Sequence, residues 1–295
     1  MNKTLFSYIL IVGITGTAGA TTGIVGKRVF GQEEIDYTGF NPESLRMDGA
    51  ALVTEYDSNP NKTYSAAELI NIGLEKYRQC ENSYSIGIGI ADTVVSQTIR
   101  NYQIKNGDKY FEESISKSSM VALANRAFQD GKDGDIVLTL GKPSNEDTAS
   151  YPENGTSYSQ DDYKAYLGKT LDEMFIYLIH NNSLLKDGTN IEKLSNGDTK
   201  VTASLNPDLA TYYYKIQMKN ISNLDRLPSF NYLTHVYTFD SNMMLKHLHA
   251  DETYSASMGI SVTIKNTIDY YYYPGEYLKI PEYNEKLDYS IKGEE

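Results

Sequence analysis

The stretch TIDYYYYPGEYLKIPEY, residues 267 to 283, decides the fold, because it places four consecutive tyrosines in a chain without tryptophan. A helix cannot bury four consecutive large side chains on one face. A β-strand sends Tyr270 and Tyr272 to one face and Tyr271 and Tyr273 to the other. An antiparallel sheet usually keeps one face polar, so we expect both faces here to be covered. One would meet helices or a concavity, and the other would lie under the linker or tail or form an amphipathic surface.

The first half of the chain predicts an antiparallel meander. Residues 83–91, 93–105 and 108–116 alternate apolar and polar side chains with the period of two that strands show. Asn106-Gly107 between the last two is a dipeptide suited to a tight hairpin turn. Residues 135–142 and the segments from residue 191 onward show strand patterns as well.

Helices are predicted around these strands. Ser65 and Glu68 form a capping box that opens a helix running to about Glu81. A second helix begins at Ser159 and carries an apolar stripe as far as Ile179.

Three further segments complete the prediction. Residues 118–130 are expected to form a short helix, residues 143–159 a surface loop, and residues 211–220, with their three tyrosines, a strand. The order of helices and strands indicates an α+β protein with one large antiparallel sheet.

Composition excludes two classes of function. Lysine and arginine number 27 against 39 aspartates and glutamates, a net charge of −12 that would repel a nucleic-acid backbone. Cys80 is the single cysteine, so neither an intrachain disulfide nor a cysteine metal cluster is possible.

Residues 1–28 predict export. Read as a signal peptide, they have an apolar middle and a small-x-small site at Ala18-Gly19-Ala20. Read as a membrane anchor, they have 22 uncharged residues from Leu5, close to the roughly 20 that cross a bilayer. Both interpretations stay open, and in both the chain after Arg28 leaves the cell, either secreted or anchored with its domain outside.

No residue pattern predicts catalysis or a metal site. His235 would leave its strand on the face opposite to His247 and His249, so the three cannot easily share an ion. Glu112 and Glu113 would also point to opposite faces. Nucleophile-elbow, zinc-protease and phosphate-loop motifs are missing from the sequence. We therefore expect a protein that is not an enzyme and has no cofactor.

Aromatic residues of the second half are the candidates for ligand binding. Tyrosine combines a large apolar ring with a hydroxyl that needs a partner, which suits the lining of an amphipathic site. The alternative is a tyrosine-rich core completed by the two helices. The predicted ligand-binding residues are Phe175, Tyr212, Tyr214, Phe239, Tyr270 and Tyr272.

Residues 65–283 resemble the LolA/LppX-like superfamily as it occurs in exported proteins of Gram-positive bacteria. The resemblance lies in the order of elements and in the phrases TFDSNMMLKHL, DETY followed by GISVTIKNT, and IDYYYY leading to YLKIPE. It implies an unclosed half-barrel sheet, with helices on its concave face, that holds a lipid, an acyl chain or a lipoprotein. No ligand residue of the family maps onto this chain, and the lipobox of many Gram-positive members is absent.

The predicted organisation has four parts: residues 1–28 as signal peptide or anchor, 29–64 as linker, 65–285 as the LolA-like domain and 286–295 as an acidic tail. The leading functional hypothesis is an exported, non-catalytic envelope protein that binds a hydrophobic or amphipathic ligand in a curved sheet. The alternative is a membrane-tethered structural or interaction module that binds another envelope protein and has no ligand cavity. A hydrolase is a third possibility, although no pair of nucleophile and base supports it.

Overall fold

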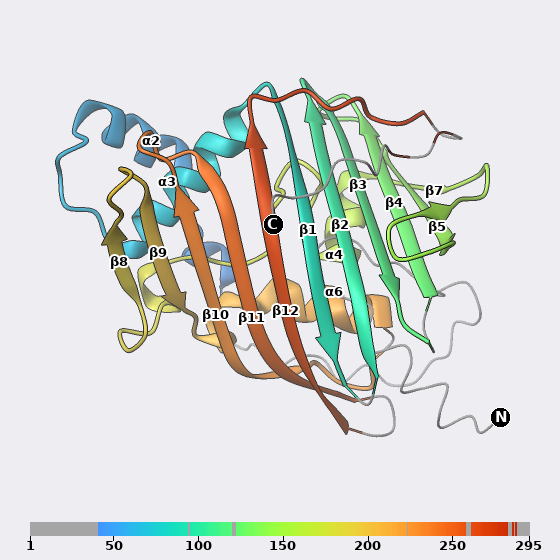
Figure 1. Ribbon diagram of the computed structural model, residues 1–295. Coiled ribbons are helices and arrows are strands. Elements are labelled where there is room, and N and C mark those ends of the chain that lie inside the picture. Colours follow the sequence, from blue (N-terminus) through green and yellow to red (C-terminus); the bar gives the residue numbers. More distant parts are fainter. Residues whose placement is uncertain are drawn as a thin grey trace.

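The fold is built on one large antiparallel sheet (Figure 1). The computed structural model describes residues 41–93, 95–119, 122–222, 224–257, 261–282, 285 and 287. Twelve strands form the sheet, eleven of them in the order β6-β5-β4-β3-β2-β1-β12-β11-β10-β9-β8, while β7 pairs with β5. The strands are β1 (Asn82–Asp92), β2 (Ser96–Asn106), β3 (Lys109–Lys117), β4 (Ala122–Asp130), β5 (Ile136–Pro143), β6 (Ala149–Ser150), β7 (Thr156–Tyr158), β8 (Asn190–Lys193), β9 (Thr199–Ser204), β10 (Ser229–Phe239), β11 (Leu245–Ser257) and β12 (Ser261–Pro274).

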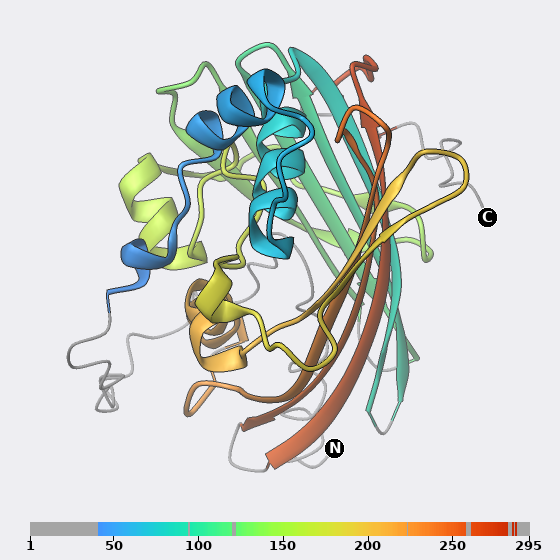
Figure 2. The ribbon, with the colours of Figure 1, turned by 90° about the vertical axis from the view of Figure 1, so that its left-hand side faces the viewer.

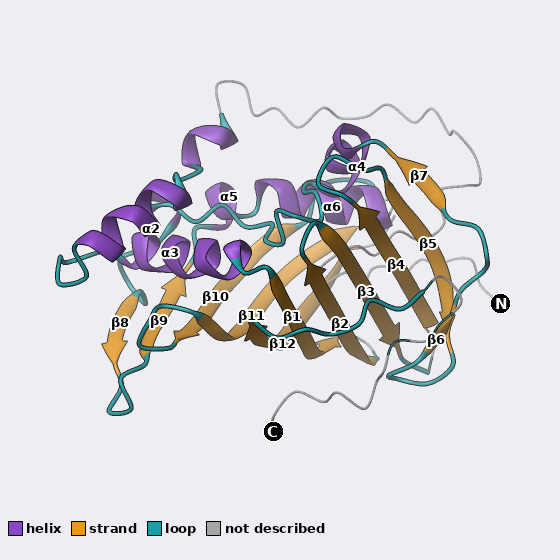
Figure 3. Cartoon of the chain, turned by 90° about the horizontal axis from the view of Figure 1, so that it is seen from above, coloured by secondary structure: helices purple, strands orange, loops and turns teal. Residues whose placement is uncertain are grey.

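The helices lie on one side of this sheet, which curves around them without closing (Figures 2 and 3). They are α2 (Gly49–Ser58), α3 (Ala66–Gln79), α4 (Gln160–Leu167), α5 (Pro207–Ala210) and α6 (Tyr212–Ser222), with the short 3₁₀-helices η2 (Pro42–Leu45) and η3 (Asn181–Ser183). We call the helix side the concave face and the opposite side the outer face. The predicted α+β architecture, an unclosed curved antiparallel sheet with helices on its concave face, is confirmed.

The pairing of β1 with β12 joins the two halves of the sheet. Gly87 lies opposite Tyr270, and a Cβ on Gly87 would lie 2.7 Å from the Tyr270 Cε1 atom. A Cβ on Gly89 would lie 2.4 Å from the Ile268 Cγ1 atom. These glycines let the large side chains of β12 lean over β1, which explains two glycines inside an otherwise regular strand.

The predicted first helix is confirmed. Ser65 Oγ accepts the Glu68 N–H at 3.3 Å, and a Glu68 carboxylate oxygen accepts the Ser65 N–H at 2.7 Å, which together form the capping box. The buried stripe of α3 packs against β9, β10 and β11. At its centre Gly73 lies directly against the ring of Phe239.

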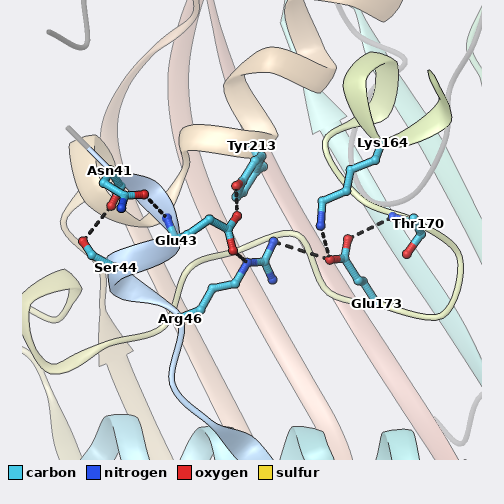
Figure 4. A network of polar contacts seen from close by, with 8 residues as sticks. All are labelled: Asn41, Glu43, Ser44, Arg46, Lys164, Thr170, Glu173 and Tyr213. Carbon is cyan, nitrogen blue, oxygen red and sulfur yellow. Dashed lines mark hydrogen bonds and ion pairs between the residues drawn. The ribbon is translucent and has the colours of Figure 1, made fainter. Parts of the chain in front are cut away.

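The linker prediction for residues 29–64 is wrong for residues 42–58, which form η2 and α2. Figure 4 shows how η2 is tied to the concave-side helices. The Arg46 guanidinium pairs with Glu43 at 2.7 Å and with Glu173 at 3.5 Å, and Lys164 of α4 pairs with Glu173 at 2.5 Å. The hydroxyl of Tyr213 in α6 donates to Glu43. The segment that follows the N-terminal region is therefore part of the folded domain.

Two secondary-structure predictions are wrong because long-range packing overrides local propensity. Residues 118–130 were expected to be helical, but Ala122–Asp130 is strand β4, paired along its length with β3 and β5. Residues 211–220 were expected to be a strand, but they lie in α6, where Tyr214 and Met218 are buried one helical turn apart. Tertiary context commonly overrides such preferences.

The second predicted helix begins at Ser159 as expected but is shorter. It ends at Gly168, which adopts a φ of +76° and donates its N–H to the Lys164 carbonyl, the conformation typical of a glycine that ends a helix. The apolar residues that follow, up to Ile179, cross the concave face without regular structure. The expected surface loop 143–159 also contains β6 and β7.

Both faces of the tyrosine strand are covered, as predicted. Tyr272 packs among concave-face residues and meets the Tyr77 ring of α3 at 5.1 Å between centroids. Tyr273 stacks on Tyr84 at 4.4 Å on the outer face. The segment after β12 runs over that face (Figure 1), where Leu278, Ile280 and Leu287 pack beside these rings. The predictions for residues 1–28 and for the acidic tail 286–295, apart from Leu287, lie outside the described residues.

Candidate functional site

The predicted ligand-binding residues are split by the structure. Phe175, Tyr214, Tyr270 and Tyr272 line a hollow of about 60 Å³ between the sheet and the irregular segment after α4. Phe239 lies elsewhere, fully buried against Gly73, and Tyr212 begins α6, where its ring contacts Tyr213. The hollow is much smaller than the roughly 300–1,000 Å³ of ordinary ligand sites, so the ligand-binding role of these residues stays a prediction.

Glu252 of β11 is the polar centre of this hollow. It is 1% exposed and accepts hydrogen bonds from the hydroxyls of Tyr177 and Tyr214 and from the Asn266 amide at 3.2 Å. His235 Nε2 lies 3.5 Å from the same carboxylate. Burial and then the nearby Glu252 charge raise the pKa of both tyrosines well above its ordinary value. These protonated hydroxyls therefore act as permanent donors to the carboxylate.

Sequence reasoning missed this polar centre. Glu252 and Asn266 occupy inward-facing positions of β11 and β12, in phase with Leu248, Ala250 and Ile268. A glutamate and an asparagine in the apolar phase of adjacent strands are unusual because buried polar groups need partners. The position of these two polar residues among apolar, inward-facing ones was the sequence signal for a buried polar centre.

Adjacent glutamates on β3 face opposite sides of the sheet, as predicted. Glu112 points to the concave face and pairs with Lys169 at 2.5 Å, both side chains being almost fully buried. Glu113 points to the outer face and pairs with Arg126, which is also buried. Each face of β3 thus carries its own buried ion pair.

The histidines also divide between the faces as predicted. His235 points inward and lies opposite Ala250. His247 and His249 contact Asp269 at 3.0 and 2.8 Å on the outer side. Burial lowers the pKa of His247. Among the described residues, no group of three or more histidine, cysteine or carboxylate side chains has the geometry of a metal site.

The larger cavity lies on the outer face. Its volume is about 410 Å³, within the range typical of ligand sites. We call it the outer pocket. Its lining comprises Lys109, Phe111, Arg126, Phe128, Val137, Thr139, Tyr151, Ile280, Pro281 and Glu282.

The floor of the outer pocket follows from strand register. Phe111, Phe128 and Val137 lie directly opposite one another on β3, β4 and β5 and form an apolar row. Arg126 and Thr139 form the next row on the same face. Cross-strand neighbours on one face stand about 5 Å apart, so these rows make a continuous apolar surface bordered by a fixed charge.

The walls of the outer pocket come from distant segments. Tyr151, in the loop between β6 and β7, lies over Gly141, where a Cβ would lie only 2.5 Å from the Tyr151 ring. Ile280 to Glu282 belong to the segment after β12. Arg126 holds both walls: its guanidinium lies 4.3 Å from the Tyr151 ring centroid, and its Nη1 donates to the Glu285 carbonyl at 2.7 Å.

The sequence does not reveal the outer pocket, because the helix predicted for residues 118–130 leaves Arg126 and Phe128 out of the sheet. The sequence offers no period-two signal at this strand. One face carries Ala124, Arg126 and Phe128 and the other Asn125, Ala127 and Gln129, so each face mixes apolar and polar side chains.

Comparisons with known proteins identify no family for this chain. A scan against protein-family models gave no match, and a search of curated proteins also gave none. Within the described part of the chain, no helix has the length and apolar character needed to cross a bilayer. The resemblance to the LolA/LppX-like superfamily therefore stays a prediction.

Proposed function

We propose that this protein is a non-catalytic, exported envelope protein that binds the apolar part of a lipid, an acyl chain or another amphipathic molecule in the outer pocket. The observation that carries the proposal is the 410 Å³ volume of this pocket, compared with 60 Å³ for the hollow on the concave face. Ligand sites usually have volumes of roughly 300–1,000 Å³, a range that includes the outer pocket and excludes the hollow.

The chemistry of the lining supports an amphipathic ligand. Phe111, Phe128, Val137, Ile280 and Pro281 supply apolar surface, and each Å² buried against them contributes roughly 25 cal/mol. Charged side chains border the pocket: Lys109, half exposed and paired with Asp130 at 3.1 Å, and Glu282. The apolar part of a ligand would fill the floor, and its polar end would stay among these charges.

The proposed location outside the membrane rests on the sequence alone. The uncharged stretch within residues 1–28 supports export by a signal peptide or an anchor. A domain that works outside the membrane would meet lipids and lipid-modified proteins there.

Filling the outer pocket tests the proposal. The purified protein is titrated with a dansyl-labelled fatty acid, and dansyl fluorescence reports binding. Val137→Trp places a large ring in the pocket and should weaken binding at least tenfold. Ile90→Trp is the matched control, because Ile90 lies on the outer face of β1, is 49% exposed and does not line the pocket.

Wild-type protein and the Ile90→Trp variant should bind the fatty acid equally. Absence of saturable binding, or equal binding by the two tryptophan variants, would reject the outer pocket as the site. If the fatty acid binds as expected, extraction of lipid that co-purifies with the wild-type protein would identify the natural ligand.

A second candidate function is an interaction module without a ligand cavity. It is favoured by β8, which ends the sheet and has no further strand partner in the described part of the chain. Its four residues are all exposed and include Ile191, 39% exposed. Free strand edges can pair with another chain. A photocrosslinker at Ile191 that captures an envelope protein in cells, combined with no fatty-acid binding, would favour this function.

A further inference from the structure

Six aromatic rings surround the 60 Å³ hollow on the concave face: Phe175, Tyr177, Tyr214, Tyr237, Tyr270 and Tyr272. Tyr177 and Tyr214 lie 5.2 Å apart between ring centroids, Phe175 and Tyr272 lie 6.2 Å apart, and Tyr270 and Tyr272 lie 6.4 Å apart. The electron-rich faces of aromatic rings attract cations, and several rings together form the cages that recognise quaternary ammonium groups.

The charges facing the hollow favour a cation. Lys169 lines it, but its charge is neutralised by Glu112 of β3 at 2.5 Å. Glu252 has no lysine or arginine partner among the described residues, and His235 of β10 is its only basic neighbour within ion-pair distance. The ionised side chains of Glu112, Lys169 and Glu252 sum to −1. A buried carboxylate without a compensating positive charge is costly.

Two buried polar atoms of the lining also lack hydrogen-bond partners. His235 and Asn266 are 0% and 1% exposed, and neither His235 Nε2 nor Asn266 Oδ1 makes a hydrogen bond, although His235 Nε2 lies 3.5 Å from the Glu252 carboxylate. Nearly all buried polar groups in folded proteins are satisfied. Both residues line the hollow together with the Glu252 carboxylate. The polar side of the hollow therefore has buried groups that a bound ligand could satisfy.

We propose that this hollow is a binding site for a small organic cation of the quaternary or alkylated ammonium class. The rings supply cation–π contacts, and Glu252 supplies the counter-charge. The volume of about 60 Å³ is several times the roughly 10–15 Å³ that a cavity needs to hold one water, so the hollow has room for a small ligand group. Phe175, Tyr177 and Tyr270 remain partly exposed, which places the site near solvent.

The site differs from the outer pocket in face, residues and ligand. It therefore stands independently of the proposed function, and its test uses other variants. The purified full-length protein is titrated with tetramethylammonium chloride, with sodium chloride at the same ionic strength as the salt control. Neopentyl alcohol, an uncharged molecule of similar shape, is the charge control. Calorimetry reports binding for every variant, and tyrosine fluorescence reports it for the wild-type protein and Glu252→Gln, which contain no tryptophan.

Tetramethylammonium should bind saturably and raise the melting temperature, and neopentyl alcohol should bind at least tenfold more weakly. Glu252→Gln should weaken cation binding at least tenfold, whereas Val137→Trp in the outer pocket should leave it unchanged. If Glu252→Gln fails to fold, Leu74→Trp replaces it, because the apolar Leu74 of α3 also lines the hollow. That variant should also weaken cation binding at least tenfold.

Three results would overturn the proposal. The first is a response to tetramethylammonium no larger than that to sodium chloride. The second is equal binding of the uncharged alcohol. The third is unchanged cation affinity in both Glu252→Gln and Leu74→Trp. The first result together with a stabilised Glu252→Gln protein would mean that Glu252 has no cationic ligand and that its charge alone destabilises the fold.

Discussion

Gly73→Ala sets two opposing effects against each other in the middle of α3. Alanine is favoured over glycine inside a helix by about 0.5–1 kcal/mol. A Cβ at position 73, however, would lie 2.1 Å from Phe239 Cε1 and 2.4 Å from its Cδ1. The Phe239 ring is 0% exposed and stacks on Tyr237 at 6.0 Å between centroids, so it has little room to move.

Overpacking of a core typically costs 1–3 kcal/mol, and contacts this short place the cost near 3 kcal/mol. Subtracting the helix preference leaves a net destabilisation of about 2 kcal/mol. For a protein of this size that corresponds to a fall in melting temperature of about 3–4 °C. Urea unfolding followed by circular dichroism measures the free energy, and a thermal melt measures the temperature.

Phe239→Leu provides the control. In its background the added methyl group has space, so Gly73→Ala should cost less than in the wild type by at least about 1 kcal/mol, which a double-mutant cycle detects. If Gly73→Ala instead stabilises the protein by the full helix preference, or if the two changes are additive, α3 does not pack on β10 as described.

Three further predictions concern the outer face and the tyrosines. Glu113→Gln leaves the buried Arg126 charge uncompensated and should destabilise the protein by about 3–5 kcal/mol in urea unfolding. The double change Glu113→Leu with Arg126→Met should recover most of that loss. Equal stability of the single and the double variant would contradict a buried ion pair. Gly141→Ala should push the Tyr151 ring off the sheet and weaken fatty-acid binding by at least threefold in the dansyl titration, and an unchanged affinity would contradict the placement of Tyr151 as a wall. Burial, followed by Glu276, raises the pKa of Tyr84 to about 12, so its unfolded form loses a proton near pH 10 while its folded form keeps it, and stability should fall as pH rises from 10 to 12. Tyrosinate absorbance should therefore rise near pH 10 for exposed tyrosines and again only with alkaline unfolding, and one single step at pH 10 would contradict the burial.

The sheet and α3 could be predicted because their sequence signals lie in residues that are close together in the chain. The Ser65–Glu68 capping box and the turn between β2 and β3 depend on neighbouring residues, which a sequence displays directly. Gly107 adopts a φ of +61° in that turn, a conformation that favours glycine. The faces to which Tyr270 to Tyr273 point could also be predicted, because successive side chains of a strand point to opposite faces.

Long-range packing produced the errors. Ala122–Asp130 contains good helix formers, but the flanking strands β3 and β5 supply hydrogen-bond partners for a strand. The tyrosines from Tyr212 favour a strand by propensity, yet the Asn206 cap and Pro207 begin a helical region just before them. Propensity differences of a few tenths of a kcal/mol per residue are smaller than such tertiary contributions.

Both candidate sites depend on contacts that no local pattern shows. The outer pocket unites β3 to β5 with Tyr151 and with the segment after β12, more than 120 residues away from Tyr151. The hollow unites Tyr177, Glu252 and Asn266 from three separate segments. The sequence supplied the aromatic residues of the hollow, whereas its carboxylate became visible only with the register of β11 and β12.

The most direct test of the central claim, that the outer face holds the apolar ligand, is a methyl NMR titration. Isoleucine and valine methyl groups are labelled, and an unlabelled fatty acid is added to the purified protein. We expect saturable shifts at Val137 and Ile280, which line the outer pocket, and no shifts at Ile268 and Val201, which lie on the concave face. Shifts at Ile268 and Val201 with Val137 and Ile280 unmoved would contradict the claim.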